Sequence, residues 1–180
     1  NGLQVEGKPH IRKIVSGGTA CQALLDRAVE LHADAVLVHH GYFWKNEAPQ
    51  VTGIKRNRLK TLLDHDISLI AYHLPLDAHQ EFGNNVQLAK QLNLRIDRPL
   101  SEKDPSMGLV GKLANPLSPR QFAKQLSVKL GRQALHIEGK NPLIETIAWC
   151  TGAAQGLIGE AFAQKADAYL SGEISEPTVH

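Results

Sequence analysis

The sequence predicts an α/β protein built from two related α/β domains with mostly parallel sheet. Two observations predict this class. Between residues 11 and 74, apolar runs of strand length alternate with helical patterns, in the order strand, helix, strand, helix, strand. The pattern of residues 14–41 then recurs at 147–174, so a second unit of the same kind is expected. Strands joined by single helices are parallel and have right-handed crossovers.

The first region contains three expected strands and two expected helices. The strands are runs of β-branched and aliphatic residues at 11–15, 34–40 and 67–74, and the helices are amphipathic stretches at 21–32 and 55–64. The adjacent glycines Gly17 and Gly18 predict a turn at 16–19 that precedes the first helix. A short helix is expected around 88–92.

The second region begins after a polar, proline-bearing stretch at 98–105, so we expect domains at 1–99 and 100–180. Ser118 and Pro119 are typical of the N-cap and first position of a helix, and a further helix is expected at 153–165. Four strands are expected, at 108–113, around 134–137, at 144–150 and at 167–170. Ser175 would cap a last helix that has only begun at residue 180.

The repeat has a constant offset of 133 residues without gaps. Nine of 28 aligned positions are identical, including the run 33–35, which matches 166–168. Duplication is one explanation, and the other is that β-α-β units in general share small and aliphatic residues. If the duplication is real, Glu173 is a carboxylate at a strand's carboxyl end and a candidate for the pocket. Otherwise it is a surface glutamate.

Composition limits the classes of function. The 180 residues carry a formal charge of only +2, so nucleic-acid binding is not expected. The basic run at 55–60 lies at a predicted helix start and is interpreted as a solvated face. Cys21 and Cys150 lack metal-finger spacing, which favours reduced cysteines, and no apolar run is long enough to span a bilayer. A cytoplasmic, soluble protein is expected, and both ends look truncated.

Two adjacent histidines, His39 and His40, end the apolar run at 34–40, and Gly41 follows them. Consecutive strand residues point to opposite faces, so adjacent histidines within a strand cannot easily serve one site. At the strand's end the glycine lets the chain turn, and both rings can face one pocket. Asp77 follows the next strand, and an aspartate between two ions about 3.5 to 4 Å apart gives a two-metal hydrolytic centre. The alternative is two strand-end histidines bonded to backbone carbonyls.

Several segments together carry a resemblance to a known family. They are VLVHHGYFW at 36–44, NRLK at 57–60, YHLPLDAH at 72–79, GNN at 83–85, AWCTG at 148–152 and SGE at 171–173. With these segments the chain resembles the bacterial branch of the NIF-three-like family, also called type 2 homologues of GTP cyclohydrolase 1. The resemblance covers essentially the whole chain and implies a NIF-three-like fold.

The resemblance also implies a dinuclear metal site inside a homohexameric ring. The family's metal ligands fall on His39, His40 and Asp77, and the two divalent ions would be zinc, iron, manganese or nickel. Its remaining ligands come from a His-x-x-x-Glu motif that does not occur in residues 1–180. His73 could move protons as a catalytic residue, and His79 could line the pocket, although a structural role is the alternative for each.

The function implied is that of a metal-dependent hydrolase resembling GTP cyclohydrolase 1 type 2, acting on a nucleotide or another small molecule. Nothing in the sequence recognises guanine. The alternative is a non-catalytic, metal-stabilised oligomeric scaffold or regulatory binding protein. An enzyme needs an open coordination position, whereas a structural site is closed.

Overall fold

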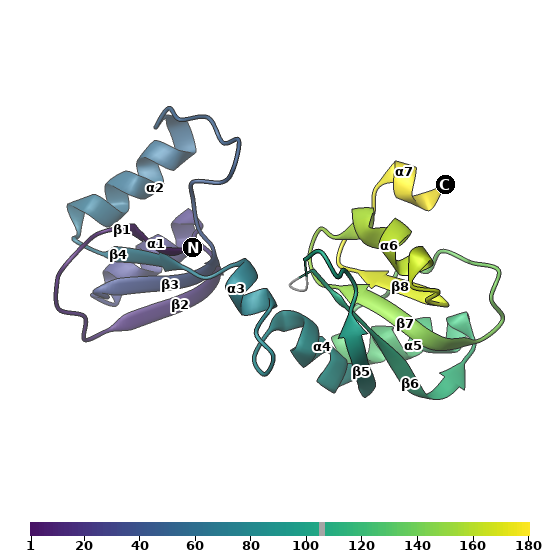
Figure 1. Cartoon of the computed structure of the whole chain (residues 1–180). Helices are drawn as coiled ribbons and strands as arrows, with labels where there is room; N and C mark the ends of the chain where they lie inside the picture. The colour runs from purple at the N-terminus through teal and green to yellow at the C-terminus, as the bar shows by residue number, and fades with distance from the viewer. Residues whose placement is uncertain (105–106) are drawn as a thin grey trace. The chain divides into compact units, whose positions relative to one another are not determined.

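The computed structural model describes residues 1–104 and 107–180 and divides the chain into two compact units, Asn1–Leu76 and Asp77–His180 (Figure 1). Each unit contains a four-stranded sheet with helices, which confirms the α/β class. The division precedes the boundary predicted near 100, because helix α4 (Asn84–Leu92) and strand β5 (Leu94–Pro99) contribute to the core of the second unit. Pro105, at the end of the predicted boundary stretch, lies outside the described residues.

The sheet of the first unit has the strand order β1-β4-β3-β2. Strands β2, β3 and β4 are parallel, as predicted, and β1 is antiparallel to β4. The elements are β1 (Gly2–Val5), β2 (Ile14–Thr19), α1 (Gln22–Glu30), β3 (Ala35–His40), α2 (Gly53–Asp64) and β4 (Ser68–Ala71). Strand β1 gave no sequence signal, because Val5 is the only buried residue in it.

The core of the first unit is formed by alternate strand residues and the apolar faces of α1 and α2. Val36 and Val38 of β3 lie beside Leu69 and Ala71 of β4 in the parallel register. They belong to one buried cluster with residues of both helices, namely Leu25, Ala28, Leu59 and Leu62. Since residues of one parity point to one face, His40 continues the row that faces this core.

Two expectations for the first unit are wrong. Residues 16–19 form the end of β2 and not a turn. Gly17 allows α1 to approach the strand there, because a Cβ at this position would come within 2.5 Å of Leu24 Cδ2. Strand β4 ends at Ala71 and not at residue 74, because Pro75 lies in the first turn of a short helix, α3 (Leu74–Asp77).

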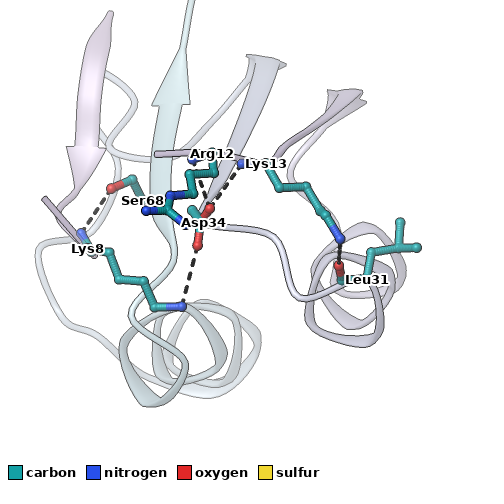
Figure 2. A network of polar contacts seen from close by, with 7 residues as sticks. Lys8, Arg12, Lys13, Leu31, Asp34 and Ser68 are labelled. Atoms are coloured by element: carbon teal, nitrogen blue, oxygen red, sulfur yellow. Dashed lines mark hydrogen bonds and ion pairs between the residues drawn. The ribbon is translucent and has the colours of Figure 1, made fainter. Parts of the chain in front are cut away.

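Asp34 ties the segment between β1 and β2 to the start of β3 (Figure 2). Its Oδ2 accepts the backbone N–H groups of Arg12 and Lys13 at 2.9 and 3.0 Å, and its Oδ1 pairs with Lys8 Nζ at 3.5 Å. The two backbone N–H groups are the main reason why the pKa of Asp34 is lowered. This contact fixes where β2 begins.

The second unit has the strand order β5-β6-β7-β8. Only β7 and β8 are parallel, so the expectation of mostly parallel sheet is wrong for this unit. Its other elements are β6 (Leu109–Leu117), α5 (Pro119–Leu130), β7 (Ile144–Cys150), a 3-10 turn (Gln155–Leu157), α6 (Ile158–Ala163), β8 (Ala168–Ser171) and α7 (Glu176–Val179). The Ser118 capping box at α5 is confirmed. No strand forms at 134–137, where Leu135 and Ile137 are exposed.

Strand β7 separates two buried clusters in the second unit. Ile147 and Trp149 pack with residues of α4 and α5, whereas Ala148 packs with Ala161 of α6. Consecutive β7 residues therefore face helices on opposite sides of the sheet. No helix in the described part of the chain is both long and apolar enough to cross a membrane.

The two segments of the sequence repeat share their backbone geometry. Ile14 pairs with Ala35, and Ile147 pairs with Ala168, which is the same register after an offset of 133 residues. Asp167 Oδ2 accepts two backbone N–H groups at the start of β7, as Asp34 does beside β2. This agreement is what a duplicated β-α-β unit requires.

Candidate metal centre

Three histidines gather at the carboxyl ends of β3 and β4 in the first unit. The ring centroids of His39 and His40 lie 4.6 Å apart, and those of His73 lie 4.8 and 5.2 Å from them. One ligand nitrogen from each residue lies within 4.8 Å of the other two, and all three side chains are half-buried. The strand end thus brings both adjacent histidines to one place.

Hydrogen bonds orient the rings of both β3 histidines. His39 Nδ1 lies 2.9 Å from the carbonyl oxygen of Tyr72, and because a carbonyl only accepts, Nδ1 carries the proton. His40 Nδ1 lies 3.1 Å from Thr19 Oγ1, which the β2–β3 register places directly beside it. A ring held through Nδ1 has Nε2 as its metal-binding atom, the arrangement typical of ligating histidines.

His73 follows β4 by two residues and completes the cluster. Its backbone N–H donates to Asn1 Oδ1 at 2.7 Å, and its carbonyl accepts the N–H of Leu76 in the first turn of α3. The sequence suggested that His73 moves protons. The geometry groups its ring with the two predicted ligands, so His73 is itself a candidate ligand.

A pocket of about 390 Å³ opens beside His40. It is lined by the ends of β2 and β3, the loop that follows β3 and the first turns of α2, with Thr19, His40, Gly41, Tyr42, Trp44, Glu47, Ile54, Lys55 and Arg58 in its wall. The Trp44 ring lies 5.0 Å from the His73 ring and 6.0 Å from the His40 ring. The pocket therefore shares one wall with the histidine cluster.

Two ionisable residues in the pocket wall, Tyr42 and Glu47, have shifted pKa values. Burial raises the pKa of Tyr42 to about 12, so its hydroxyl stays protonated and donates to the carbonyl of Ala20 at 2.6 Å. The hydrogen bond from Lys55 is the main reason why the pKa of Glu47 is lowered. Glu47 and Lys55 form an ion pair of 3.1 Å.

The other predicted site residues belong to the second unit. Asp77 ends α3 and begins this unit, and its Oδ1 accepts a hydrogen bond of 2.7 Å from Asn84 Nδ2. His79 Nδ1 accepts the backbone N–H groups of Glu81 and Phe82, which is a structural contact of a turn. Glu173 is exposed just beyond β8, and its backbone carbonyl accepts a bond from Ser171.

The residues of the cluster fit a divalent transition metal. Imidazole nitrogen suits zinc, iron and nickel, and three such ligands leave a tetrahedral ion one further position. Half-buried rings held by a carbonyl and a hydroxyl match the surroundings of ligating histidines. The His39, His40 and His73 cluster is therefore a candidate metal site.

Of the nine residues in the pocket wall, only His40 was predicted from the sequence as a site residue. For the basic run at 55–60, helical spacing could have indicated which residues reach the pocket. Lys55 and Arg58 are three residues apart and share one side of α2. Arg56 is exposed and lies outside the pocket wall, and Lys60 pairs with Asp64. Helical spacing thus distinguishes two pocket residues from the solvated members of the run.

Replacement of Thr19 with valine is expected to weaken metal binding about 10-fold to 100-fold, because His40 loses the partner that orients its ring. Valine keeps the side-chain volume, so a loss of packing does not contribute. Competition with a chromophoric chelator measures the affinity. Thr146→Val, on a strand of the second unit, is the matched control, and equal affinities in the two variants would contradict the prediction.

Comparisons with known proteins agree with this architecture. The sequence profile of Duf34/NIF3 (NGG1p interacting factor 3) matches residues 1–180. A Pseudomonas aeruginosa protein named GTP cyclohydrolase 1 type 2 homolog is 60% identical over 100% of this chain and 71% of its own length.

Two solved structures are also similar. The protein ybgI, described as of unknown function, has a TM-score of 0.93 and 49% identity, over 100% of this chain and 72% of that one. TTHA1606 from Thermus thermophilus has a TM-score of 0.83 and 34% identity, over 100% of this chain and 71% of that one. With the profile matched from end to end and a relative at 60% identity, the chain belongs to the Duf34/NIF3 family.

Proposed function

We propose that this protein is a metal-dependent hydrolase with a dinuclear centre. His39, His40 and His73 would hold the metal, and Asp77, which the sequence predicts as a ligand, would join them. Divalent ions in such a site acidify a water molecule and polarise the bond that it attacks. The Pseudomonas aeruginosa relative's name, GTP cyclohydrolase 1 type 2 homolog, supports a nucleotide as the substrate. We also propose that the protein assembles into a homohexameric ring, and this proposal is based on the family resemblance alone.

The observation that carries the proposal is the position of His40, which belongs both to the histidine cluster and to the wall of the pocket. A structural metal site is closed by its protein ligands, whereas a catalytic site keeps a position for water or substrate. A pocket that reaches a candidate ligand supports such an open position.

Residues of this chain have separate tasks in the proposed reaction. Thr19 and the Tyr72 carbonyl keep the His40 and His39 rings in place, so little reorganisation is needed when the reaction begins. The Trp44 ring lies beside the rings of His40 and His73, so it would contact a substrate bound at the cluster. Tyr42 keeps its proton and therefore does not act as a base at neutral pH.

Metal analysis and hydrolysis assays test the proposal together. We expect two divalent ions per chain after purification without chelators, and release of product from GTP or another nucleoside phosphate. Stripping with a chelator should abolish this turnover, and restored metal should recover it. Absence of metal after reconstitution, or turnover that survives stripping, would overturn the proposal.

Asp77→Asn separates the hydrolase from the scaffold. A hydrolase should lose turnover at least about 100-fold while the variant stays folded and keeps its assembly state, measured by circular dichroism and light scattering. A scaffold should dissociate instead. Asp66→Asn is the control, because Asp66 is an exposed aspartate in a left-handed backbone conformation that asparagine tolerates.

A further inference from the structure

The pocket beside His40 contains an arginine whose charge nothing in the described structure neutralises. We propose that Arg58 binds an anionic group of the substrate, of the phosphate class, and thereby places the rest of the substrate against Trp44 and the metal site. This inference rests on the proposed hydrolase, because it names the substrate class of the same site.

The side chain of Arg58 supplies the main evidence. Its Nε atom is buried and has no hydrogen-bond partner among the residues that the structure describes. A buried donor without a partner is unfavourable, and more so when it belongs to a charged group. A guanidinium presents its N–H groups in a planar fork that matches the oxygens of phosphate or carboxylate. Because Arg58 also lines the pocket, its guanidinium is placed to meet an anion that binds there.

The other charges of the pocket do not neutralise Arg58. Lys55 Nζ pairs with Glu47 at 3.1 Å and lies 4.8 Å from the centre of the Phe43 ring, so this lysine is already held. The lowered pKa of Glu47 keeps its carboxylate charged, and that charge offsets Lys55. Among the residues that line the pocket, one positive charge remains, and it is that of Arg58.

The beginning of α2 adds to the positive potential. Its first turn contains no acidic residue, and the N-cap Thr52 makes no side-chain hydrogen bond to the helix. The first backbone N–H groups of a helix have no partner within the helix, and its N-terminal end carries a partial positive charge. Ile54 and Lys55 of this turn line the pocket, so the anion would also lie near the favourable end of the helix dipole.

The size of the pocket and its remaining walls favour a small molecule. A volume of about 390 Å³ falls within the range of ligand pockets and holds more than a single phosphate. Trp44 provides a flat apolar surface against which the remainder of a phosphate ester can pack. A hydrolysed bond near His40 and an anion on Arg58 would then belong to one substrate.

Titration of the metal-free protein with inorganic phosphate, at constant ionic strength, tests the inference. The metal is removed so that the signal cannot arise from phosphate bound to a metal ion. The indole N–H signal of Trp44 in ¹H–¹⁵N NMR spectra reports occupancy, since only two tryptophans occur in the chain. We expect a saturable shift in the unmodified protein and a dissociation constant raised about tenfold or more in Arg58→Gln.

Two further variants make the test specific. Arg56→Gln removes the same charge from an exposed position of the same helix and should change the dissociation constant less than about twofold. Ile54→Glu places a carboxylate four residues before Arg58 on the same helix, where it can pair with the guanidinium and repel an anion, so it should weaken phosphate binding. Ile54 is 70% exposed, so this variant should fold even if Arg58→Gln does not.

The outcomes separate the two proposals. Absence of a saturable shift, or equal weakening by Arg58→Gln and Arg56→Gln, would overturn the inference even if the metal-loaded protein hydrolyses nucleotides. Phosphate binding that depends on Arg58 in a protein without hydrolytic activity would support the anion site and overturn the hydrolase alone.

Discussion

Replacement of His40 with alanine is expected to weaken metal binding by more than about 100-fold and to abolish metal-dependent turnover. Loss of a residue that only orients a ligand costs about 10-fold to 100-fold in affinity, and loss of the ligand itself should cost more. His40 also lines the pocket, so the variant removes the link between the metal and the bound substrate. Elemental analysis and a competitive chelator titration measure the effect.

His10→Ala is the matched control, because His10 is exposed and lies outside the histidine cluster. It should retain the metal content and the turnover of the unmodified protein. Circular dichroism should show that His40→Ala remains folded, since the side chain is only half-buried at a strand end. A folded His40→Ala protein with unchanged metal affinity would contradict the assignment of this cluster.

Replacement of Trp149 with alanine is expected to lower the free energy of unfolding by about 3 to 5 kcal/mol. The Trp149 side chain is fully buried between β7 and α4, and its Nε1–H donates to the carbonyl of Asn85 at 2.9 Å. Alanine would leave a cavity in the core of the second unit and a buried carbonyl without its donor. Denaturation in urea, followed by circular dichroism, measures the change.

Trp149→Phe keeps a six-membered aromatic ring but removes the N–H donor and part of the buried ring volume. It should cost about 1 to 3 kcal/mol, less than the alanine variant. A loss below about 1 kcal/mol in Trp149→Ala would show that Trp149 does not hold α4 against the sheet.

The sequence predicted the strands of the first unit better than those of the second. Regular alternation of apolar strands and amphipathic helices predicted the parallel strands β2, β3 and β4, because periodicity directly reflects burial. Strands β1 and β5 gave no such signal, since each has a single buried residue. The second unit shows the same limit, because strand direction in β5, β6 and β7 follows from pairing between distant residues.

Some features of the candidate site were likewise predicted from the sequence, and others became apparent only in the structure. The sequence by itself determined that His39 and His40 end a strand beside a glycine, and it identified the family through its motifs. Only the tertiary structure decided that the ring of His73 joins them, that Thr19 orients His40, and that Arg58 faces the same pocket. The physical reason is that local periodicity fixes which face a residue occupies, whereas strand register and loop path fix which distant side chains meet there.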